Sequence, residues 1–364
     1  MRVVFAPDKF AGTLSAVEAA AAMARGWARR APDDDLVQVP MSDGGPGFVD
    51  VLHTALGGDL HAVTVTGPLG EPTPAAVLRL GETAYVESAQ AIGLHLVEPD
   101  RRDPERAHTR GLGELLEQAL ATGARRIVLG LGGSATNDAG AGMLAALGAT
   151  TGAGALDGGP TGLRDAESVD LAPVQEKFEG VELVMATDVD NPLLGINGAT
   201  KIYGPQKGLP DERLVVVDGW LQHFAEVTDR KVAAQKGAGA AGGIGFGLML
   251  LGATRTAGVE VVAEAVDLDG HLSRADLVVT GEGAFDFSSR SGKVPYGVAE
   301  VASRRVVPCI ALAGQVLVGS REMRALGVES AYSLVDLVGE ERAMGAPAEA
   351  LADLAERTAR TWSR

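Results

Sequence analysis

A glycine-rich stretch at residues 130–142 constrains this chain more than any other feature. It reads Gly-Leu-Gly-Gly-Ser-Ala-Thr-Asn-Asp-Ala-Gly-Ala-Gly, between an apolar run at 126–129 that predicts a buried strand and a helical pattern at 143–147. In a unit of strand, glycine turn and helix, backbone N–H groups can face an anion. The residues leave two interpretations open: an anion-binding turn, or an ordinary tight turn in which Asn137 or Asp138 caps the helix.

The spacing of strand and helix patterns predicts an α/β protein with two domains, which the length of 364 residues also favours. Strands alternate with helices over residues 1–58 and again over residues 273–364, which predicts one doubly wound parallel sheet. The region between them begins with short strand patterns separated by turns, the mark of antiparallel neighbours. We therefore predict a second, mixed α/β domain inserted at residues 59–272.

Three local patterns predict a capped helix, an irregular loop and a buried thiol. Ser15 and Glu18 form a capping-box pattern ahead of an alanine-rich helix expected over residues 16–30. Residues 150–171 are rich in Gly and Asp and predict an irregular loop. Cys309 lies within an apolar run, which indicates a buried and inert thiol.

The net charge of −16 argues against nucleic acid and against an anionic membrane surface as partners. The single cysteine excludes an intramolecular disulfide and a cysteine-based zinc site. No apolar run reaches the length of a membrane span and the first residues read as a strand, so we expect a cytoplasmic protein. An anionic ligand would need local lysines, backbone amides or a divalent cation to offset the negative field.

Polar residues follow several predicted strands, and the carboxyl ends of parallel strands share one edge of a sheet. The candidates from the terminal domain are Asp8, Lys9, Ser42, Asp43, Gly44, Gly281, Glu282, Asp286 and Lys293. Those from the insert are Gly132, Gly133, Ser134, Asn137, Asp138, Asp188, Asp190 and Asn191. Such a rim suits phosphoryl transfer, which needs phosphates held by amides and lysine, a carboxylate-bound Mg²⁺ and a carboxylate that positions the attacking hydroxyl.

Several of these candidates also have an ordinary structural interpretation. Asp188 and Asp190 fit Asx turns ahead of a proline. Lys9 and Lys293 fit solvated surface lysines. The second glycine-dense segment, 237–247, favours close helix packing over ligand contact. Glu282 stands between two glycines, a poor place for packing, which favours a functional role.

Taken together, the motifs resemble the class I glycerate kinase family. The resemblance rests on eight motifs in chain order, at residues 6–16, 41–45, 66–70, 130–142, 186–192, 203–208, 237–247, and 280–286 with 291–293. It implies a flavodoxin-like domain with a second α/β domain inserted. It also implies ATP-dependent phosphorylation of D-glycerate with Mg²⁺, to 2-phosphoglycerate or 3-phosphoglycerate.

The resemblance also implies roles for the candidates. Asp188 or Asp190 would be the base or positioning carboxylate, with Lys9 beside it as a further catalytic candidate. The candidate metal ligands are Asp138, Glu282 and Asp286. The candidate substrate and phosphate ligands are Asp8, Ser42, Asp43, Gly44, Gly132, Gly133, Ser134, Asn137, Asn191, Gly281 and Lys293. A cation must meet the glycerate carboxylate, and Lys9, Lys207 and Lys293 are the candidates.

Two turns depart from the family pattern. Lys9 stands where the family has serine and Ala11 where it has lysine, so the positive charge is kept but displaced by two residues. Phe287-Ser288-Ser289 lacks a glutamine that the family often carries. The rival functions are a kinase of another small 2-hydroxy acid and a non-catalytic sensor of a sugar acid or nucleotide. We expect a monomer or homodimer whose inserted turn acts on substrate when the domains close.

Overall fold

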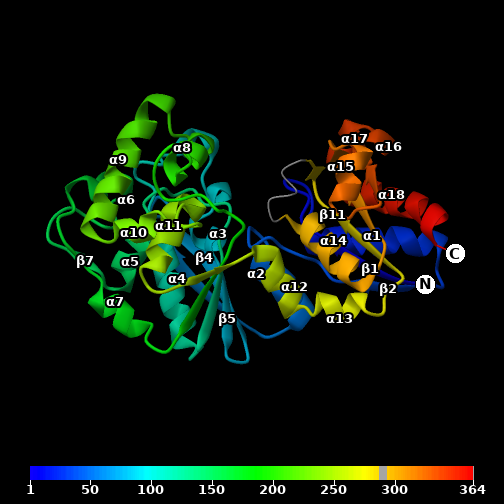
Figure 1. The fold of residues 1–364 in the computed structure, drawn as a ribbon, viewed down its shortest axis with the longest axis horizontal. Coiled ribbons are helices and arrows are strands. Elements are labelled where there is room, and N and C mark those ends of the chain that lie inside the picture. The colour runs from blue at the N-terminus through cyan, green and yellow to red at the C-terminus, as the bar shows by residue number, and fades with distance from the viewer. Residues whose placement is uncertain (287–292, 364) are drawn as a thin grey trace. The chain divides into compact units, whose positions relative to one another are not determined.

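The computed structural model describes residues 1–286 and 293–363, and the chain divides into two compact units (Figure 1). Unit 1 comprises Met1–Asp43, Asp50–Gly57 and Ala257–Arg364, and unit 2 comprises Gly44–Val49 and Gly58–Thr256. This division differs from the expected one at both junctions. Residues 257–272 belong to unit 1, and a short segment beginning at Gly44 belongs to unit 2.

Unit 1 is built on a five-stranded parallel sheet in the order β15-β13-β11-β1-β2. The strands are β1 (Arg2–Pro7), β2 (Asp35–Gln38), β11 (Leu277–Gly281), β13 (Cys309–Ala313) and β15 (Ser330–Ser333). All residues of β11 and β13 are buried, as the continuous apolar runs of central parallel strands require. A short strand follows each of these two strands in the sequence, β12 (Ala284–Phe285) after β11 and β14 (Gln315–Val316) after β13. β12 and β14 pair in parallel with each other.

Helices accompany this sheet. They are α1 (Ala16–Arg30), α2 (Phe48–Leu56, which crosses the unit boundary), α12 (Gly258–Ala265), α13 (Leu268–Leu272), α14 (Val294–Arg305), α15 (Ser320–Ala325), α16 (Leu334–Val338), α17 (Glu340–Gly345) and α18 (Pro347–Trp362). The predicted capping box of α1 is confirmed, with reciprocal bonds between Ser15 and Glu18. α1 and α18 lie side by side (Figure 1), and Gly26 allows the contact because a Cβ there would lie 1.9 Å from the Ala352 carbonyl oxygen.

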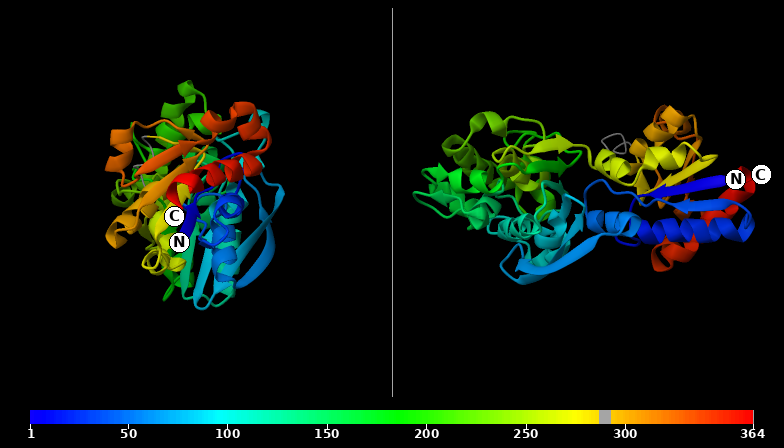
Figure 2. Two further views of the ribbon diagram at one scale, coloured as in Figure 1. Left: turned by 90° about the vertical axis from the view of Figure 1, so that its right-hand side faces the viewer. Right: turned by 90° about the horizontal axis from the view of Figure 1, so that it is seen from below.

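Both chain ends lie together in unit 1 (Figure 2). The Met1 amino group donates to Asp34 Oδ1 at 2.8 Å, and Ser363 Oγ donates to Asp34 Oδ2 at 2.8 Å. Trp27 Nε1 donates to the same Oδ2 at 2.9 Å. Burial acts to raise the pKa of Asp34, but these donors outweigh it and lower the pKa. One carboxylate therefore ties the two ends of the chain to α1.

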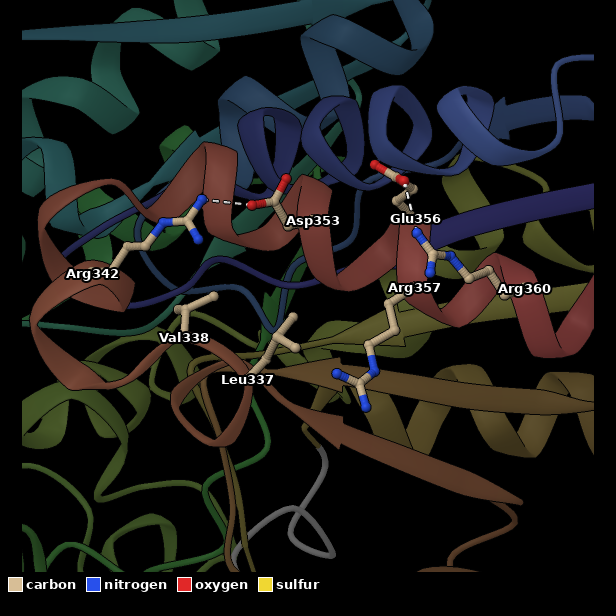
Figure 3. Close-up of a pocket in the computed structure, with 7 residues that line it drawn as sticks. All are labelled: Leu337, Val338, Arg342, Asp353, Glu356, Arg357 and Arg360. Carbon is tan, nitrogen blue, oxygen red and sulfur yellow. Dashed lines mark hydrogen bonds and ion pairs between the residues drawn. The ribbon is translucent and has the colours of Figure 1, made fainter.

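A pocket in unit 1 lies among α16, α17 and α18 (Figure 3). Arg342 pairs with Asp353 at 2.6 Å, and Arg360 pairs with Glu356 at 3.3 Å. All four of these side chains are partly exposed, and exposed pairs of this kind typically contribute about 0–1 kcal/mol. We interpret the pocket as a solvent-filled gap between surface side chains and not as a binding site.

Unit 2 is built on a six-stranded mixed sheet in the order β10-β9-β6-β5-β4-β3. The strands are β3 (Asp59–Thr66), β4 (Pro72–Leu80), β5 (Thr83–Glu87), β6 (Arg126–Gly130), β9 (Glu182–Ala186) and β10 (Thr254–Thr256). β3, β4 and β5 are antiparallel neighbours, which confirms the predicted meander, and β5, β6, β9 and β10 run parallel. The overall fold is thus α/β, with one parallel and one mixed sheet.

The helical segments of unit 2 supply most of its apolar core. The α-helices are α3 (Ser88–Ile92), α4 (Arg110–Ala121), α5 (Ala141–Leu147), α6 (Gly159–Gly162), α7 (Ala172–Lys177), α8 (Ala199–Tyr203), α9 (Asp211–Val227), α10 (Arg230–Ala233) and α11 (Ala240–Met249). The 3₁₀ turns are η1 (Leu94–Leu96), η2 (Pro99–Arg101), η3 (Leu163–Asp165) and η4 (Pro205–Lys207). No helix in the described ranges has both the length and the apolar character needed to cross a bilayer.

Two segments of unit 2, residues 150–171 and 237–247, can be compared with what the sequence predicted for them. The prediction of an irregular loop at 150–171 was wrong, because the segment holds the two-residue strands β7 (Thr150–Thr151) and β8 (Val169–Asp170) with α6 and η3 between them. Elements this short leave no periodicity in a sequence. The packing interpretation of 237–247 is supported, since a Cβ at Gly243 would lie 2.6 Å from Ala139 Cα.

Candidate active site

Unit 1 gathers its charged candidates at the carboxyl ends of β1 and β11. The two strands are parallel, with Pro7 opposite Gly281, so Asp8 and Glu282 follow at neighbouring positions although they are far apart in sequence. The Asp8 amide donates to the Gly281 carbonyl at 2.8 Å, which extends the pairing by one residue. Both carboxyl side chains are nearly buried.

Lys9 lies between two carboxylates of this cluster. Its Nζ is 3.5 Å from Asp8 Oδ1 and 3.1 Å from Asp43 Oδ1, and its backbone amide donates to Asp8 Oδ1 at 2.7 Å. Asp43 is brought here by the segment after β2, where the Met41 amide donates to the Pro7 carbonyl at 2.9 Å. The displaced lysine is therefore an ordered part of the cluster rather than a solvated surface residue.

Burial raises the pKa of Asp8 to about 7, and the carboxylates of Asp43 and Glu282 push it the same way. The Lys9 ammonium and amide oppose the rise without cancelling it. For Lys9 itself, burial acts to lower the pKa, but the charges of Asp8 and Asp43 outweigh it, and the pKa is raised. Asp8 thus exchanges its proton near neutrality while Lys9 keeps its charge.

Lys293 joins two further acidic candidates. Its Nζ lies 3.3 Å from Glu282 Oε2 and 3.5 Å from Asp286 Oδ1. Lys293 directly precedes α14 as its N-cap residue. Residues 287–292, which include the departing Phe287-Ser288-Ser289 and the 291–292 part of the last motif, lie outside the described residues. Among the residues that are described, no group of three or more His, Cys, Asp or Glu side chains could hold a metal ion.

In unit 2, the glycine turn between β6 and α5 is organised by Asp138. Its Oδ2 accepts from the Thr109 amide and hydroxyl, both at 2.8 Å, and from the Gly142 amide at 3.2 Å. Its Oδ1 accepts from the Gly140 amide at 3.1 Å. The residue is fully buried, and burial raises its pKa against the pull of these donors. We read Asp138 as the structural acceptor of the turn, because four donors already occupy its carboxyl group.

The glycines of two candidate turns pack directly against each other within unit 2. A Cβ at Gly130 would lie 2.6 Å from the Gly44 carbonyl oxygen, and one at Gly132 would lie 2.7 Å from Gly45 Cα. A Cβ at Gly44 would lie 2.6 Å from the Ala186 carbonyl oxygen. Close backbone packing is thus a sufficient reason for these glycines. Gly133, by contrast, is exposed and adopts a φ of +69°.

The polar side chains of the turn contact three partners from other segments, and the sequence analysis named only one of them, Lys207. Ser134 Oγ accepts from Lys207 Nζ at 2.9 Å, and Asn137 Nδ2 donates to Thr200 Oγ1 at 3.0 Å. Thr109, which holds Asp138, is the third. Lys207 appeared only as one of three possible cations, because a lysine beside a glycine in a polar segment gives no sign that it is buried.

The segment after β9 holds the two candidate bases in different surroundings. Asp190 is more than half exposed, and it pairs with Lys236 at 3.1 Å and with Arg255 at 2.8 Å. Asn191 is tied to its own loop, donating to the Asn197 carbonyl and accepting from the Tyr203 hydroxyl, both at 2.8 Å. Asp188 is half-buried, two residues beyond the end of β9. Ser42, at the end of the first segment of unit 1, is buried.

Comparison with known proteins identifies the family. Residues 3–363 match the model of the glycerate kinase family. The chain belongs to the glycerate kinase family. It is 42% identical over 375 residues to a glycerate kinase of Bacillus subtilis (strain 168), covering 99% of this chain and 96% of that protein. It is 40% identical over 349 residues to a glycerate 2-kinase of Escherichia coli (strain K12), covering 93% and 92%.

A solved structure agrees with this assignment. The crystal structure of a Salmonella typhimurium LT2 protein designated glycerate kinase 2 superposes with a TM-score of 0.83 at 37% identity, covering 99% of this chain and 98% of that chain. The glycerate kinase family membership makes this protein a phosphotransferase enzyme. The resemblance found in the sequence motifs is thereby confirmed.

The raised pKa of Asp8 predicts how stability depends on pH. Because the folded-state pKa is about 7 against an ordinary value of 3.8, the folded state favours the protonated form. This contribution is fully present below pH ~4 and is lost as the pH rises through ~7. We expect the unfolding free energy of wild type relative to Asp8→Asn to fall by on the order of 1–4 kcal/mol between pH 4 and pH 8. Urea unfolding of both proteins across that range measures it, and a pH-independent difference would contradict the assignment.

Proposed function

We propose that the protein transfers the terminal phosphoryl group of ATP to D-glycerate, with Mg²⁺ as cofactor and 2-phosphoglycerate as product. The observation that carries the proposal is the cluster of Asp8, Lys9, Asp43, Glu282 and Lys293 at the carboxyl ends of β1 and β11. Phosphoryl transfer is catalysed by positioning and charge stabilisation, and it needs lysines and carboxylates in this arrangement. The relatives named glycerate kinase and glycerate 2-kinase support the acceptor and the position phosphorylated.

Glu282 and Asp286 are the residues that we propose to hold Mg²⁺. They share one ammonium group, that of Lys293, so the pair already attracts a cation. Mg²⁺ usually binds proteins through one or two carboxylates and completes its shell with water and substrate phosphates, so a larger acidic group is not required. The bound ion would neutralise charge on the phosphates. Lys293 and Lys9 would donate to phosphate oxygens, and the glycerate hydroxyl would attack.

Asp188 is our choice for the carboxylate that positions or deprotonates the attacking hydroxyl. A general base needs a carboxylate that can reach the hydroxyl. Asp190 is held by two cations, Lys236 and Arg255, and this leaves its oxygens engaged in ion pairs. Asp188 lies closer to the end of β9 and is better shielded from water. We assign Asp190 to holding the loop.

We also infer that unit 1 has a flavodoxin-like fold. In chain order, the strands of the unit 1 sheet are arranged 2-1-3-4-5 when numbered within the sheet, since β2 flanks β1 and β11, β13 and β15 follow on its other side. This is the flavodoxin-like strand order, in which ligands bind near the carboxyl ends of the first and third strands. Those strands here are β1 and β11, where the charged cluster lies.

The direct test is turnover of D-glycerate by the purified protein with Mg²⁺ and ATP. We expect ADP release that depends on D-glycerate, and a phosphorus NMR spectrum of the product that matches 2-phosphoglycerate. A panel of other small 2-hydroxy acids serves as the comparison. Absence of ADP release above background would refute the function, preference for another acid would reassign the acceptor, and 3-phosphoglycerate would reassign the position.

Neighbouring aspartates provide a matched pair of variants. We expect Asp188→Asn to lower kcat by about 10²–10⁴-fold, the usual range for loss of general acid–base catalysis. Asp190→Asn is the control from the same loop, and we expect it to lower kcat less than about tenfold while reducing thermal stability slightly. Both variants are compared at saturating ATP and D-glycerate. The reverse ranking of the two kcat values would reassign the role to Asp190.

A further inference from the structure

Lys207 is the buried cation of unit 2. It ends η4, is 2% exposed, and is the one lysine or arginine that is buried in the part of the chain that the structure describes. Removing an ammonium group from water is costly unless opposite charge or hydrogen-bond acceptors compensate it. A buried lysine in an enzyme family therefore calls for a reason beyond packing.

The ammonium is held by the glycine turn and by no ion pair with a described residue. Nζ donates to Ser134 Oγ at 2.9 Å and to the Thr136 carbonyl oxygen at 2.5 Å. Asp138 is the acidic group whose charge acts on it, and that carboxylate is already engaged by four donors. The positive charge of Lys207 is thus left without a dedicated counterion in the described structure.

The backbone around Lys207 is shaped to admit it. Gly242 in α11 adopts a φ of +74°, and a Cβ there would lie 2.8 Å from Lys207 Nζ and 1.9 Å from the Thr136 carbonyl oxygen. Three segments distant in sequence, the turn after β6, η4 and the start of α11, therefore meet at one ammonium group. Thr136 Oγ1 and Asn137 Oδ1 are also buried there without a hydrogen-bond partner among the described atoms.

The direction of one hydrogen bond determines what the turn can offer to a ligand. When Lys207 donates to Ser134 Oγ, the hydroxyl proton of Ser134 must point elsewhere. The preceding residue, Gly133, is exposed, and the amides of Gly133 and Ser134 donate to no described group. A neutral Lys207 would instead accept the Ser134 proton. Burial lowers the pKa of Lys207 to about 7 against the pull of Asp138, so both forms are accessible at neutral pH.

We propose that protonated Lys207 is a positioning residue that turns the Ser134 hydroxyl outward to donate to the carboxylate of the acceptor acid. The naming of the acceptor rests on the proposed function. A carboxylate oxygen and a nucleotide phosphate oxygen would use the same donor, and the experiment separates them. The negative charge of the bound acid also compensates the buried ammonium, so binding favours the protonated form of Lys207 and takes up a proton.

The kinetic test uses Ser134→Ala, Lys207→Met and Lys207→Arg, with Lys201→Met as the matched control from neighbouring α8, whose ammonium lies 3.8 Å from Asp218. We expect Ser134→Ala and Lys207→Met to raise KM for D-glycerate by about 10- to 100-fold, as for a lost hydrogen bond to a charged group. KM for ATP should stay near that of wild type, and Lys207→Arg should recover part of the loss. A rise in KM for ATP alone would overturn the assignment to the acceptor carboxylate.

Proton uptake separates positioning from a purely structural role. Calorimetric titration of D-glycerate at pH 7.5, in two buffers of different ionisation enthalpy, measures it directly. We expect uptake of a fraction of a proton by wild type and by Lys201→Met, and none by Lys207→Met. Equal uptake by Lys207→Met, or none by wild type, would overturn the proposal. If Lys207→Met does not fold, the KM values of Ser134→Ala and Lys207→Arg decide it.

The outcome remains separable from that of the proposed function. If wild type shows no turnover of D-glycerate, the proposed function fails, and the same titrations are run with ADP and with inorganic phosphate. Proton-linked binding that Ser134→Ala weakens would then retain Ser134 and Lys207 as an anion site while removing the acceptor acid as its ligand. Binding of all three anions unchanged in Ser134→Ala and Lys207→Met would refute the inference itself.

Discussion

The parallel pairing of β1 with β11 is the constraint on which the rest of unit 1 depends. It sets Pro7 opposite Gly281, and the next residues of the two strands are Asp8 and Glu282. Neither carboxylate would be buried at this end of the sheet without compensation. Lys9, which directly follows Asp8, and Lys293, which directly precedes α14, provide it. The sheet therefore concentrates charge where an ordinary core would exclude it, and this is the property that a phosphate-handling site needs.

In unit 2 the main structural requirement is to hold a glycine-rich turn in one conformation. Glycine gives the backbone freedom that folding must remove. Asp138 removes it with four hydrogen bonds, and Lys207 fixes the preceding residues through Ser134 and Thr136. One buried acid and one buried base thus hold the same turn. The carboxylate of Asp138 accepts four hydrogen bonds, whereas the ammonium of Lys207 has no dedicated counterion among the described residues. Lys207 is therefore the residue that points to a bound anion.

Sequence reasoning performed best where one local rule decides the outcome. The capping box at Ser15 and Glu18, the antiparallel meander and the buried Cys309, whose thiol pKa burial raises to about 12, all follow from patterns within a few residues. The parallel strand pairs that gather the charged cluster were anticipated from the alternation of strands and helices. The family was found from motifs, each of which is weak alone.

It performed worst where a residue's role depends on distant neighbours. Asp138 is a metal-ligand candidate from its sequence context, which cannot show that Thr109 donates two hydrogen bonds to it from another segment. Lys207 was only one of three candidate cations, because the sequence cannot show that its ammonium packs against Gly242. Asp190 is a candidate base from its sequence context, which cannot show its ion pairs with Lys236 and Arg255. In each case the deciding contact lies about 30 or more residues away.

Our central proposal is that the cluster at the ends of β1 and β11 binds a metal–nucleotide complex. The most direct test is the affinity for ADP with and without Mg²⁺, measured by calorimetry for wild type and for Glu282→Gln. The account predicts that Mg²⁺ tightens ADP binding to wild type, and that this tightening is largely lost in the variant while metal-free ADP binding persists. The same Mg²⁺ dependence in both proteins would contradict it.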